Sequence, residues 1–185
     1  MRTPKHATSE RILAAAAGLF ATNAYGEISV DEIAREAGTT KVTVYQHFGS
    51  KERLFLDCLR MRLERREAML DRFFEQLPER SDPLLALFGW LEGWLDPRNF
   101  KGCAFVKAVN ELSATVPEVR AIAADAKRRI GRRITALAQS SGRPRPAELA
   151  QELALIFEGA QSLALIEASA RPARIARRIA EGLLK

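Results

Sequence analysis

The sequence is poor in cysteine and histidine, two residue types from which metal centres, disulfide frameworks and catalytic sites are commonly built. Its 185 residues include only two cysteines, Cys58 and Cys103, and two histidines, His6 and His47. Two cysteines so placed make neither a disulfide framework nor a metal-ligand spacing. Both histidines lie near the N-terminus, away from any candidate nucleophile. We therefore expect no metal, no cofactor and no enzymatic activity.

Long apolar runs are lacking as well. We expect no stretch long enough to span a bilayer, and RILAAAAGLF near the N-terminus is interrupted and amphipathic, unlike the core of a signal peptide. These patterns predict a cytoplasmic protein with no membrane segment. The apolar content of 47% still allows a good core, and the length leaves room for two helical domains.

The net charge of +6 suits a polyanionic partner, but its distribution weakens that argument. Basic residues barely outnumber acidic ones between Met1 and Arg60, whereas Asp125 is the only acid between Arg120 and Arg145. The densest run, KRRIGRR at 127–133, fits a solvated helix face better than a contact with DNA or a membrane.

The stretch 28–51, ISVDEIAREAGTTKVTVYQHFGSK, contains helix-start and helix-stop signals in close succession, which together predict its secondary structure. Ser29 and Glu32 form a capping box, and Ile28 with Ile33 forms a hydrophobic staple, so a helix begins at Ser29. Gly38 ends this helix in the left-handed conformation. The first element is therefore a helix of about two turns that stops at a glycine.

A second short helix follows, with Thr39 or Thr40 as its cap and Gly49 at its end. Val44 and Phe48 occupy its inward face, which leaves phosphate binders and base-reading residues facing out. This pattern predicts a helix-turn-helix whose second helix can enter the major groove. The alternative is a helical hairpin of an ordinary core, with the same polar residues as a solvated face.

Three segments, RILAAAAGLF, SVDEIAREAG and TTKVTVYQHFGSKERLF, follow one another between Thr8 and about Cys58. In order and spacing they resemble the DNA-binding domain of the TetR (tetracycline-repressor) family of transcriptional regulators. The resemblance implies an all-α homodimer, with an N-terminal three-helix DNA-binding domain at 1–52 and a C-terminal helical domain for effector binding and dimerisation at 53–185. Ala24 stands where the family usually has glycine, so Asn23 or Gly26 would take the left-handed conformation instead.

The resemblance also implies the contacts with DNA. Val42 and Gln46 match variable positions that face bases, where valine can pack on a thymine methyl and glutamine can pair with adenine. The full set of expected DNA-binding residues is Thr40, Lys41, Val42, Thr43, Tyr45, Gln46, His47 and Lys51, of which the other six mostly hold phosphates. Arg2 and Lys5 either extend this surface as an arm or belong to a disordered terminus.

Beyond this domain, Ser50 is expected to cap a long connector helix that ends before Pro78, and Asp82 with Pro83 begins the next helix. Aromatic side chains are dense from there to Phe105, so this region either lines a cavity for a hydrophobic or aromatic effector or belongs to plain core. The expected effector-binding residues are Phe88, Trp90, Leu91, Trp94, Phe100, Phe105 and Asn110, with Lys107 and Glu111 as further polar anchors. Cys103 is either a reactive sensor or a buried thiol.

The helix from Pro146 is apolar over more than one face and so requires two partners, and the helix from Pro172 carries a second apolar stripe. Paired with their copies from a second subunit they would form an intermolecular four-helix bundle, as the resemblance also implies. The expected dimerisation residues are Leu149, Leu153, Phe157, Ala160, Leu163, Ile175, Ile179 and Leu183.

Taken together, the sequence favours a homodimeric repressor that a small hydrophobic or aromatic effector releases from a double-stranded DNA operator. A small helical enzyme is the first rival, but it would need a nucleophile with a base, paired carboxylates or metal ligands in its C-terminal half. A helical adaptor with a vestigial helix-turn-helix is the second, and the presence of Lys41, Tyr45 and Lys51 counts against it.

Overall fold

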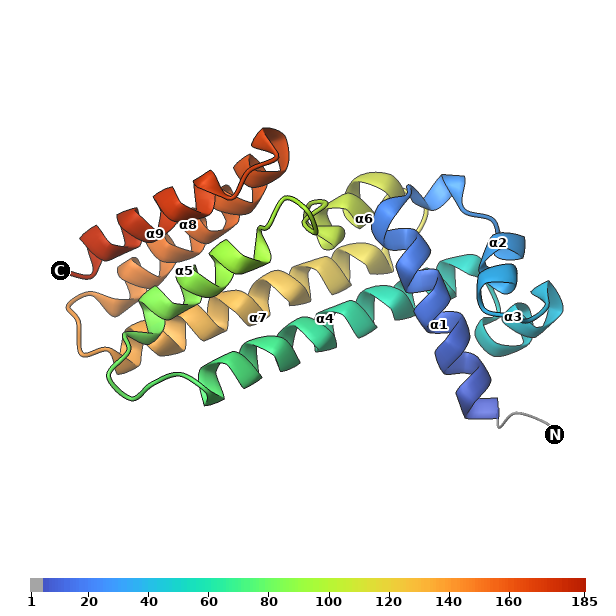
Figure 1. Cartoon of the computed structure of the whole chain (residues 1–185), viewed down its shortest axis with the longest axis horizontal. Helices are drawn as coiled ribbons and strands as arrows, with labels where there is room; N and C mark the ends of the chain where they lie inside the picture. The colour runs from blue at the N-terminus through green and yellow to red at the C-terminus, as the bar shows by residue number, and fades with distance from the viewer. Residues whose placement is uncertain (1–4) are drawn as a thin grey trace. The chain divides into compact units, whose positions relative to one another are not determined.

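The computed structural model describes residues 5–185, and every element in that range is helical (Figure 1). The elements are α1 (Lys5–Thr22), the 3-10 helix η1 (Tyr25–Glu27), α2 (Val30–Glu36), α3 (Lys41–Phe48), α4 (Lys51–Glu75), α5 (Pro83–Trp94), α6 (Ala104–Leu112), α7 (Glu118–Ser140), α8 (Pro146–Glu167) and α9 (Arg171–Leu183). The predicted all-α fold class is confirmed.

The chain forms two compact units that are not simple halves of the sequence. Unit 1 contains the residues up to Arg66 together with Lys107–Ala123, and unit 2 contains Glu67–Val106 and Ala124–Lys185. Three helices, α4, α6 and α7, therefore begin in one unit and end in the other. The domain boundary that the sequence predicted, after residue 52, stays a prediction. Residue 52 lies inside α4, so no linker marks a boundary there.

In unit 1, α1, α2 and α3 pack against one another. The predicted inward side chains Ile12, Ala16, Ile33 and Val44 are buried. Ser50 caps α4 as expected, because its hydroxyl accepts a hydrogen bond from the Arg53 N–H at 3.1 Å. Burial of one face of each helix thus accounts for the packing of α1, α2 and α3.

Unit 2 is built around a large apolar cluster. Asp82 caps α5 by accepting from the N–H groups of Leu84 and Leu85, with Pro83 at the first helical position, as predicted. Helix α9 packs against both α5 and α8. The cluster includes Leu70 from α4, Phe88 and Leu91 from α5, Ile134 from α7 and Leu153 from α8.

Three local expectations need correction. Helix α1 begins by Lys5, so neither Thr8 nor Ser9 caps it; the Ser9 hydroxyl instead donates to the His6 carbonyl inside the helix. After α1, neither Asn23 nor Gly26 takes the left-handed conformation, and η1 makes the turn instead. Of the expected N-terminal arm, Arg2 and the side chain of Lys5 lie outside the described residues.

Helix α8 corrects the expectation that no segment could span a bilayer. By length and composition it is the one described helix that could, with a mean hydropathy of 1.3. This is weak evidence for a membrane segment, because core helices meet the same two criteria. Six side chains of α8, from Leu149 to Ala164, are buried in unit 2.

Candidate nucleic-acid interface

The geometry of α2 and α3 follows the local signals in their sequence. The Ser29 hydroxyl accepts from the Glu32 N–H at 3.1 Å, and the Glu32 carboxylate accepts from the Ser29 N–H at 2.7 Å, which completes the capping box. Gly38 takes a φ of +61°, so the chain turns there, and Thr40 caps α3. Gly49, with a φ of +77°, ends α3 as predicted.

A contact from α1 holds the turn between the two helices. The Arg11 guanidinium donates to the carbonyl of Ala37 at 2.9 Å and to that of Gly38 at 3.0 Å. These carbonyls lie at the C-terminal end of α2, where backbone acceptors lack helical partners and a cation is favourable. Sequence reasoning missed this role of Arg11, because no local pattern links residues so far apart in the chain.

The outward face of α3 is accessible. Val44 anchors the helix and is buried, whereas Thr40, Lys41, Tyr45 and Gln46 are exposed. Val42 is 65% exposed, an unusual position for a large aliphatic side chain on a short helix. Thr43 and His47 are half-buried, and the Thr43 hydroxyl lies 2.9 Å from that of Thr40.

The two lysines expected to bind phosphate already have partners within the protein. Lys41 Nζ donates to the Asp31 carboxylate at 2.9 Å, and this pair, which is open to solvent, raises the pKa of Lys41. Lys51 is half-buried, and its Nζ donates to the Tyr25 carbonyl at 2.6 Å. Burial lowers the pKa of Lys51. Lys41 can exchange its partner for a phosphate, whereas Lys51 is held by the protein.

Tyr25 is the centre of a network that sequence reasoning did not find. Its ring stacks on Phe20 and meets Phe55 edge-on, while the Lys51 ammonium lies 4.0 Å from the ring centroid. Its hydroxyl donates to the Glu52 carboxylate at 2.9 Å. Burial first, and then this carboxylate, raise the pKa of Tyr25 well above its usual value. The network joins the turn after α1 to the start of α4.

Two side chains of α6 complete the same turn. The Glu111 carboxylate accepts from the Tyr25 N–H at 2.9 Å, and Lys107 Nζ donates to the Asn23 carbonyl at 2.8 Å. Lys107 and Glu111 were expected to anchor an effector. Their charged groups instead form hydrogen bonds with the backbone of unit 1. Contacts between residues more than eighty positions apart leave no trace in local sequence patterns.

The expected effector-binding residues are divided between the two units. Phe88, Leu91 and Phe105 are buried in unit 2, and Trp90, Trp94 and Phe100 are half-buried there against its apolar cluster. The two indole rings stack with their centroids 5.1 Å apart. Asn110 is exposed and belongs to unit 1. The aromatic side chains thus gather around α5, while the proposed cavity stays a prediction.

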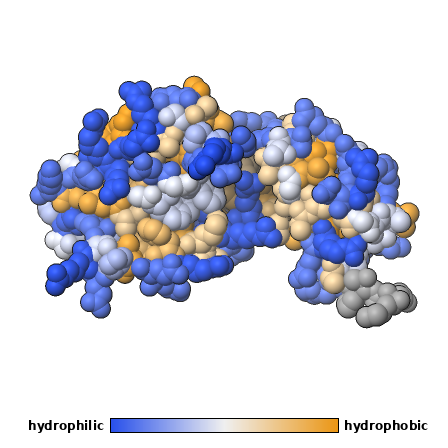
Figure 2. All heavy atoms as spheres, in the orientation of Figure 1, coloured by the Kyte–Doolittle hydropathy of each residue, from blue (hydrophilic) through white to orange (hydrophobic). Residues whose placement is uncertain are grey.

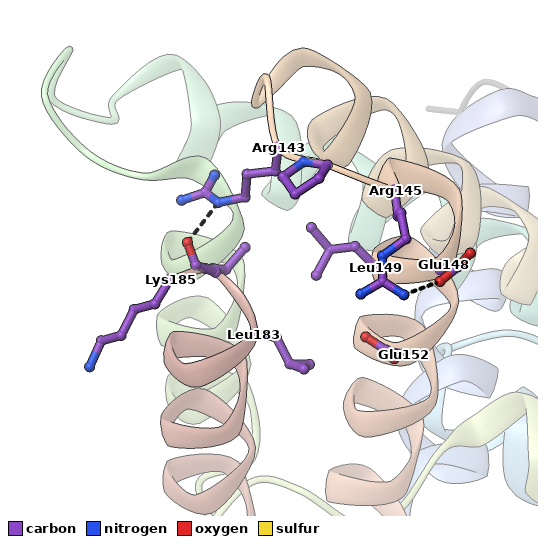
Figure 3. A pocket seen from close by; sticks show the side chains of 9 residues that line it. Arg143, Arg145, Glu148, Leu149, Glu152, Leu183 and Lys185 are labelled. Carbon is purple, nitrogen blue, oxygen red and sulfur yellow. Dashed lines mark hydrogen bonds and ion pairs between the residues drawn. The ribbon is translucent and has the colours of Figure 1, made fainter.

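A hollow of about 210 Å³ lies elsewhere in unit 2, between the start of α8 and the end of α9 (Figure 3). Leu149 and Leu183 line it together with Arg143 and Arg145. Arg143 donates to the Asp82 carboxylate and to the Leu184 carbonyl, and Arg145 donates to Glu148. Both guanidinium groups of this lining are therefore already paired within unit 2, and the charged side chains of Glu152 and Lys185 line the hollow as well.

The expected dimerisation residues differ in exposure. The side chains of Leu149, Leu153, Phe157 and Ala160 are buried in the core of unit 2. Leu163, Ile179 and Leu183 are exposed, and Ile175 is half-buried. The sequence showed two apolar faces on α8 but not which one the core would take.

Further exposed apolar residues on α8 are Leu155, Leu165 and Ile166, the last of them 77% exposed. Residues 155, 163 and 166 share one face of the helix. Figure 2 shows apolar surface alternating with strongly hydrophilic surface over α8 and α9. The accessible apolar surface of this hairpin therefore lies on the face opposite the buried stripe.

The described residues contain no group of three or more His, Cys, Asp or Glu arranged to hold a metal ion. Cys58 is buried, and burial raises the pKa of its thiol to about 12. Cys103 is half-buried, with Lys127 Nζ 3.6 Å from its sulfur. The two thiols thus have different environments. Cys58 packs as a small apolar side chain in the core, as the sequence predicted.

A short helix held across another by a glycine turn, with an accessible outer face and a third helix fixing the turn, defines a helix-turn-helix domain. The family model for bacterial regulatory proteins of the tetR family matches residues 12–58, which contain these elements. Residues 12–58 are therefore a DNA-binding domain of the TetR type.

Two relatives are similar to this chain in sequence. The HTH-type transcriptional regulator EthR of Mycolicibacterium smegmatis is 35% identical over 95 residues, which are 46% of this chain and 43% of EthR. The match thus spans less than half the length of that curated relative. A TetR transcriptional regulator from Chloroflexus aurantiacus has 25% identity and a TM-score of 0.80, over 95% of this chain and 93% of that one.

A TetR-family transcriptional regulator from Streptomyces coelicolor has a TM-score of 0.86 at 21% identity, over 97% of this chain and 95% of the other. At that identity the likeness shows the fold alone. The fold therefore extends over nearly the whole chain, whereas the likeness to the curated relative covers less than half of it.

Proposed function

We propose that this protein is a cytoplasmic, homodimeric transcriptional repressor, without catalytic activity or cofactor, which a small hydrophobic or aromatic molecule releases from its operator. Residues 1–52 bind DNA in this proposal, and residues 53–185 bind the effector and dimerise, with Lys107–Ala123 supporting the DNA-binding part. The observation that carries it is the outer face of α3, where Val42 and Gln46 are exposed.

The accessible residues of α3 suit two kinds of contact. Lys41, Thr40 and Tyr45 carry groups that bind phosphate and fix the position of the helix, but phosphate contacts do not discriminate between sequences. Gln46 can form paired hydrogen bonds with adenine, and Val42 can pack on a thymine methyl. Lys51 is half-buried and bonded to the Tyr25 carbonyl, so its role is to stabilise the domain. Thr43 and His47 are half-buried, so only part of each side chain can contact DNA.

The test begins with selection of duplexes by the native protein from a random library, followed by affinity measurements at several salt concentrations. Gln46→Ala should weaken binding by roughly 1 to 3 kcal/mol on the selected duplex alone. Lys41→Ala should weaken binding to every duplex and flatten the salt dependence. Equal losses on selected and random duplexes for both variants would contradict these roles.

Dimerisation is supported by the exposed apolar face of α8 and α9. Large apolar side chains grouped on one face are typical of an interface rather than of a free surface. Two such hairpins, related by a two-fold axis, would cover Leu155, Leu163 and Ile166 with Ile179 and Leu183. The two copies of α3 would then face successive major grooves of a pseudo-palindromic operator.

The choice of effector rests on the side chains gathered around α5. Trp90, Trp94 and Phe100 are half-buried, so each keeps some surface that a ligand can contact. Because Lys107 and Glu111 bind the turn after α1, few polar anchors remain, which favours an apolar or aromatic molecule over a sugar. A thermal-shift screen of apolar and polar compounds checks this. Hits confined to sugars, or unchanged by Trp94→Ala, would overturn it.

A further inference from the structure

The turn between α2 and α3 determines where the helix predicted to read bases begins. Residues 37–40 are the whole connection between these two helices. The Gly38 N–H donates to the Arg35 carbonyl at 3.1 Å, and the Thr39 N–H donates to the Ala34 carbonyl at 2.9 Å. These two donors of the turn are thus bonded to α2, but the carbonyls at this end of the helix need partners from elsewhere.

The Arg11 side chain supplies such partners from a third helix, α1. Its Nη2 donates to the carbonyls of Ala37 and Gly38 at 2.9 and 3.0 Å, and its Nε donates to the Ala37 carbonyl at 3.3 Å. The planar guanidinium has its donors in fixed directions, so one side chain holds two neighbouring carbonyls in a defined orientation. Arg11 is exposed, but Ile12 and Ala16 on the same helix are fully buried and keep α1 in place. The position of the turn is therefore set by α1 as well as by α2.

Helix α3 has little packing of its own to fix its orientation. Of its eight residues, Val44 alone is fully buried. A short helix held by one buried side chain can tilt about that point unless both of its ends are held. Helix α4 follows the C-terminal end of α3 within two residues, so the turn at 37–40 is what holds the N-terminal end. A tilt would displace the outward side chains of α3 from the base edges that they are predicted to read.

We propose that Arg11 is a positioning residue for sequence recognition, which sets the orientation of α3 in which Val42 and Gln46 reach base edges. The proposal rests on the proposed function, since it presumes that α3 reads bases. Base contacts depend on close alignment of atoms, whereas contacts with the backbone of DNA carry no sequence information. Loss of the Arg11 guanidinium should therefore reduce discrimination between duplexes more than it reduces binding to DNA in general.

The alternative is that Arg11 leaves the turn and contacts a phosphate in the complex. A phosphate contact adds the same affinity on every duplex and releases counterions. Its loss would reduce the slope of log affinity against log salt by about 0.9. A positioning residue that stays on the two carbonyls leaves this slope unchanged. The two roles of Arg11 thus give different results in one set of affinity measurements.

The experiment uses the full chain, a duplex that the native protein has selected from a random library, and a random duplex of the same length. Affinities for both are measured at several salt concentrations. The first variant is Arg11→Met, which keeps an apolar stem and removes the guanidinium. The ratio of the two affinities should fall about three- to tenfold, as expected for lost hydrogen bonds that are partly exposed. The affinity for the random duplex should change by less than about twofold, and the salt slope should stay the same.

The ratio also separates positioning from a general loss of stability. A partly unfolded variant has a smaller active fraction, which weakens binding to both duplexes by the same factor and leaves the ratio unchanged. Arg11→Lys keeps the charge but lacks the planar fork, so it should recover only part of the ratio. The matched control is Arg35→Met, which removes an exposed arginine from the last turn of α2. It should keep the native ratio.

A native ratio in Arg11→Met, or equal losses on both duplexes with a smaller salt slope, would overturn the proposal. Should Arg11→Met fail to fold, Arg11→Lys carries the test, and a native ratio in it has the same meaning. Failure of the native protein to select any duplex overturns the proposed function itself. That failure appears before any variant is made.

Discussion

The Lys41–Asp31 pair places a competitor beside the side chain best suited to bind phosphate. Asp31 lies in the first turn of α2, where the helix dipole favours a negative charge. Its carboxylate also binds the Lys41 ammonium at 2.9 Å. In the proposed complex Lys41 must leave this carboxylate to reach DNA. The acid therefore stabilises α2 while it opposes binding.

Replacing Asp31 by Asn should increase the affinity for any duplex, because it frees Lys41 and removes a charge near phosphate. We expect about a two- to fivefold gain at low salt that shrinks as salt is raised. Filter binding at several salt concentrations measures it. Glu36→Gln, which removes an exposed acid elsewhere on α2, should give a smaller gain. Equal gains from both variants would show that the pair itself is irrelevant.

The two cysteines should differ in reactivity. Thiolate is the reactive form, and burial raises the pKa of Cys58 to about 12, so almost none is ionised at pH 8. Cys103 has part of its surface open and a lysine ammonium near its sulfur. Iodoacetamide at pH 8 should therefore alkylate Cys103 well before Cys58, as judged by peptide mass spectrometry. Equal rates at the two sites would contradict this burial.

At the scale of single elements, α2 depends on its cap. With seven residues the helix is too short to persist alone, so the two hydrogen bonds of the Ser29–Glu32 box and the packing of Ile33 hold it in place. The box also lowers the pKa of Glu32, chiefly because the Ser29 N–H donates to its carboxylate.

Ser29→Ala should lower the free energy of unfolding by about 1 kcal/mol, the usual cost of a lost N-cap. Chemical denaturation followed by circular dichroism measures this change. Ser29→Asp keeps an acceptor for the Glu32 N–H and should recover most of the loss. An alanine variant as stable as the native protein would mean that the capping box does not support α2.

The elements differ in how far sequence could predict them. Ser29, Gly38, Thr40 and Gly49 act within a few residues, so local rules placed α2 and α3 correctly. On α8 both faces are apolar, and composition alone cannot tell which face meets the core. The roles of Arg11, Tyr25, Lys107 and Glu111 depend on contacts distant in sequence, and no local pattern carries that information.

For the whole molecule, the exposed face of the α8–α9 hairpin determines the proposed assembly. Leu163 is 50% exposed in the single chain, so a charge there would cost the monomer little. Covered by a partner, the same charge would lose its water and cost several kcal/mol. A substitution at this position therefore separates association from folding.

Leu163→Glu should give a folded monomer in sedimentation at micromolar concentration, with helical content unchanged. The matched control is Val106→Glu, also at an exposed apolar position but on α6. It should leave the dimer intact. A stable dimer of the Leu163 variant would place the interface on another surface.

The discontinuous make-up of unit 1 limits how this protein can be recombined with others of similar fold. A chimaera that joined residues up to Arg66 to a foreign sensor domain would leave out Lys107–Ala123, and with it the side chains that bind Asn23 and Tyr25. Such a graft would expose the apolar surface that Leu112 and Val119 cover. Exchange of DNA specificity is therefore better made by replacing the outward residues of α3 alone than by transplanting the N-terminal segment.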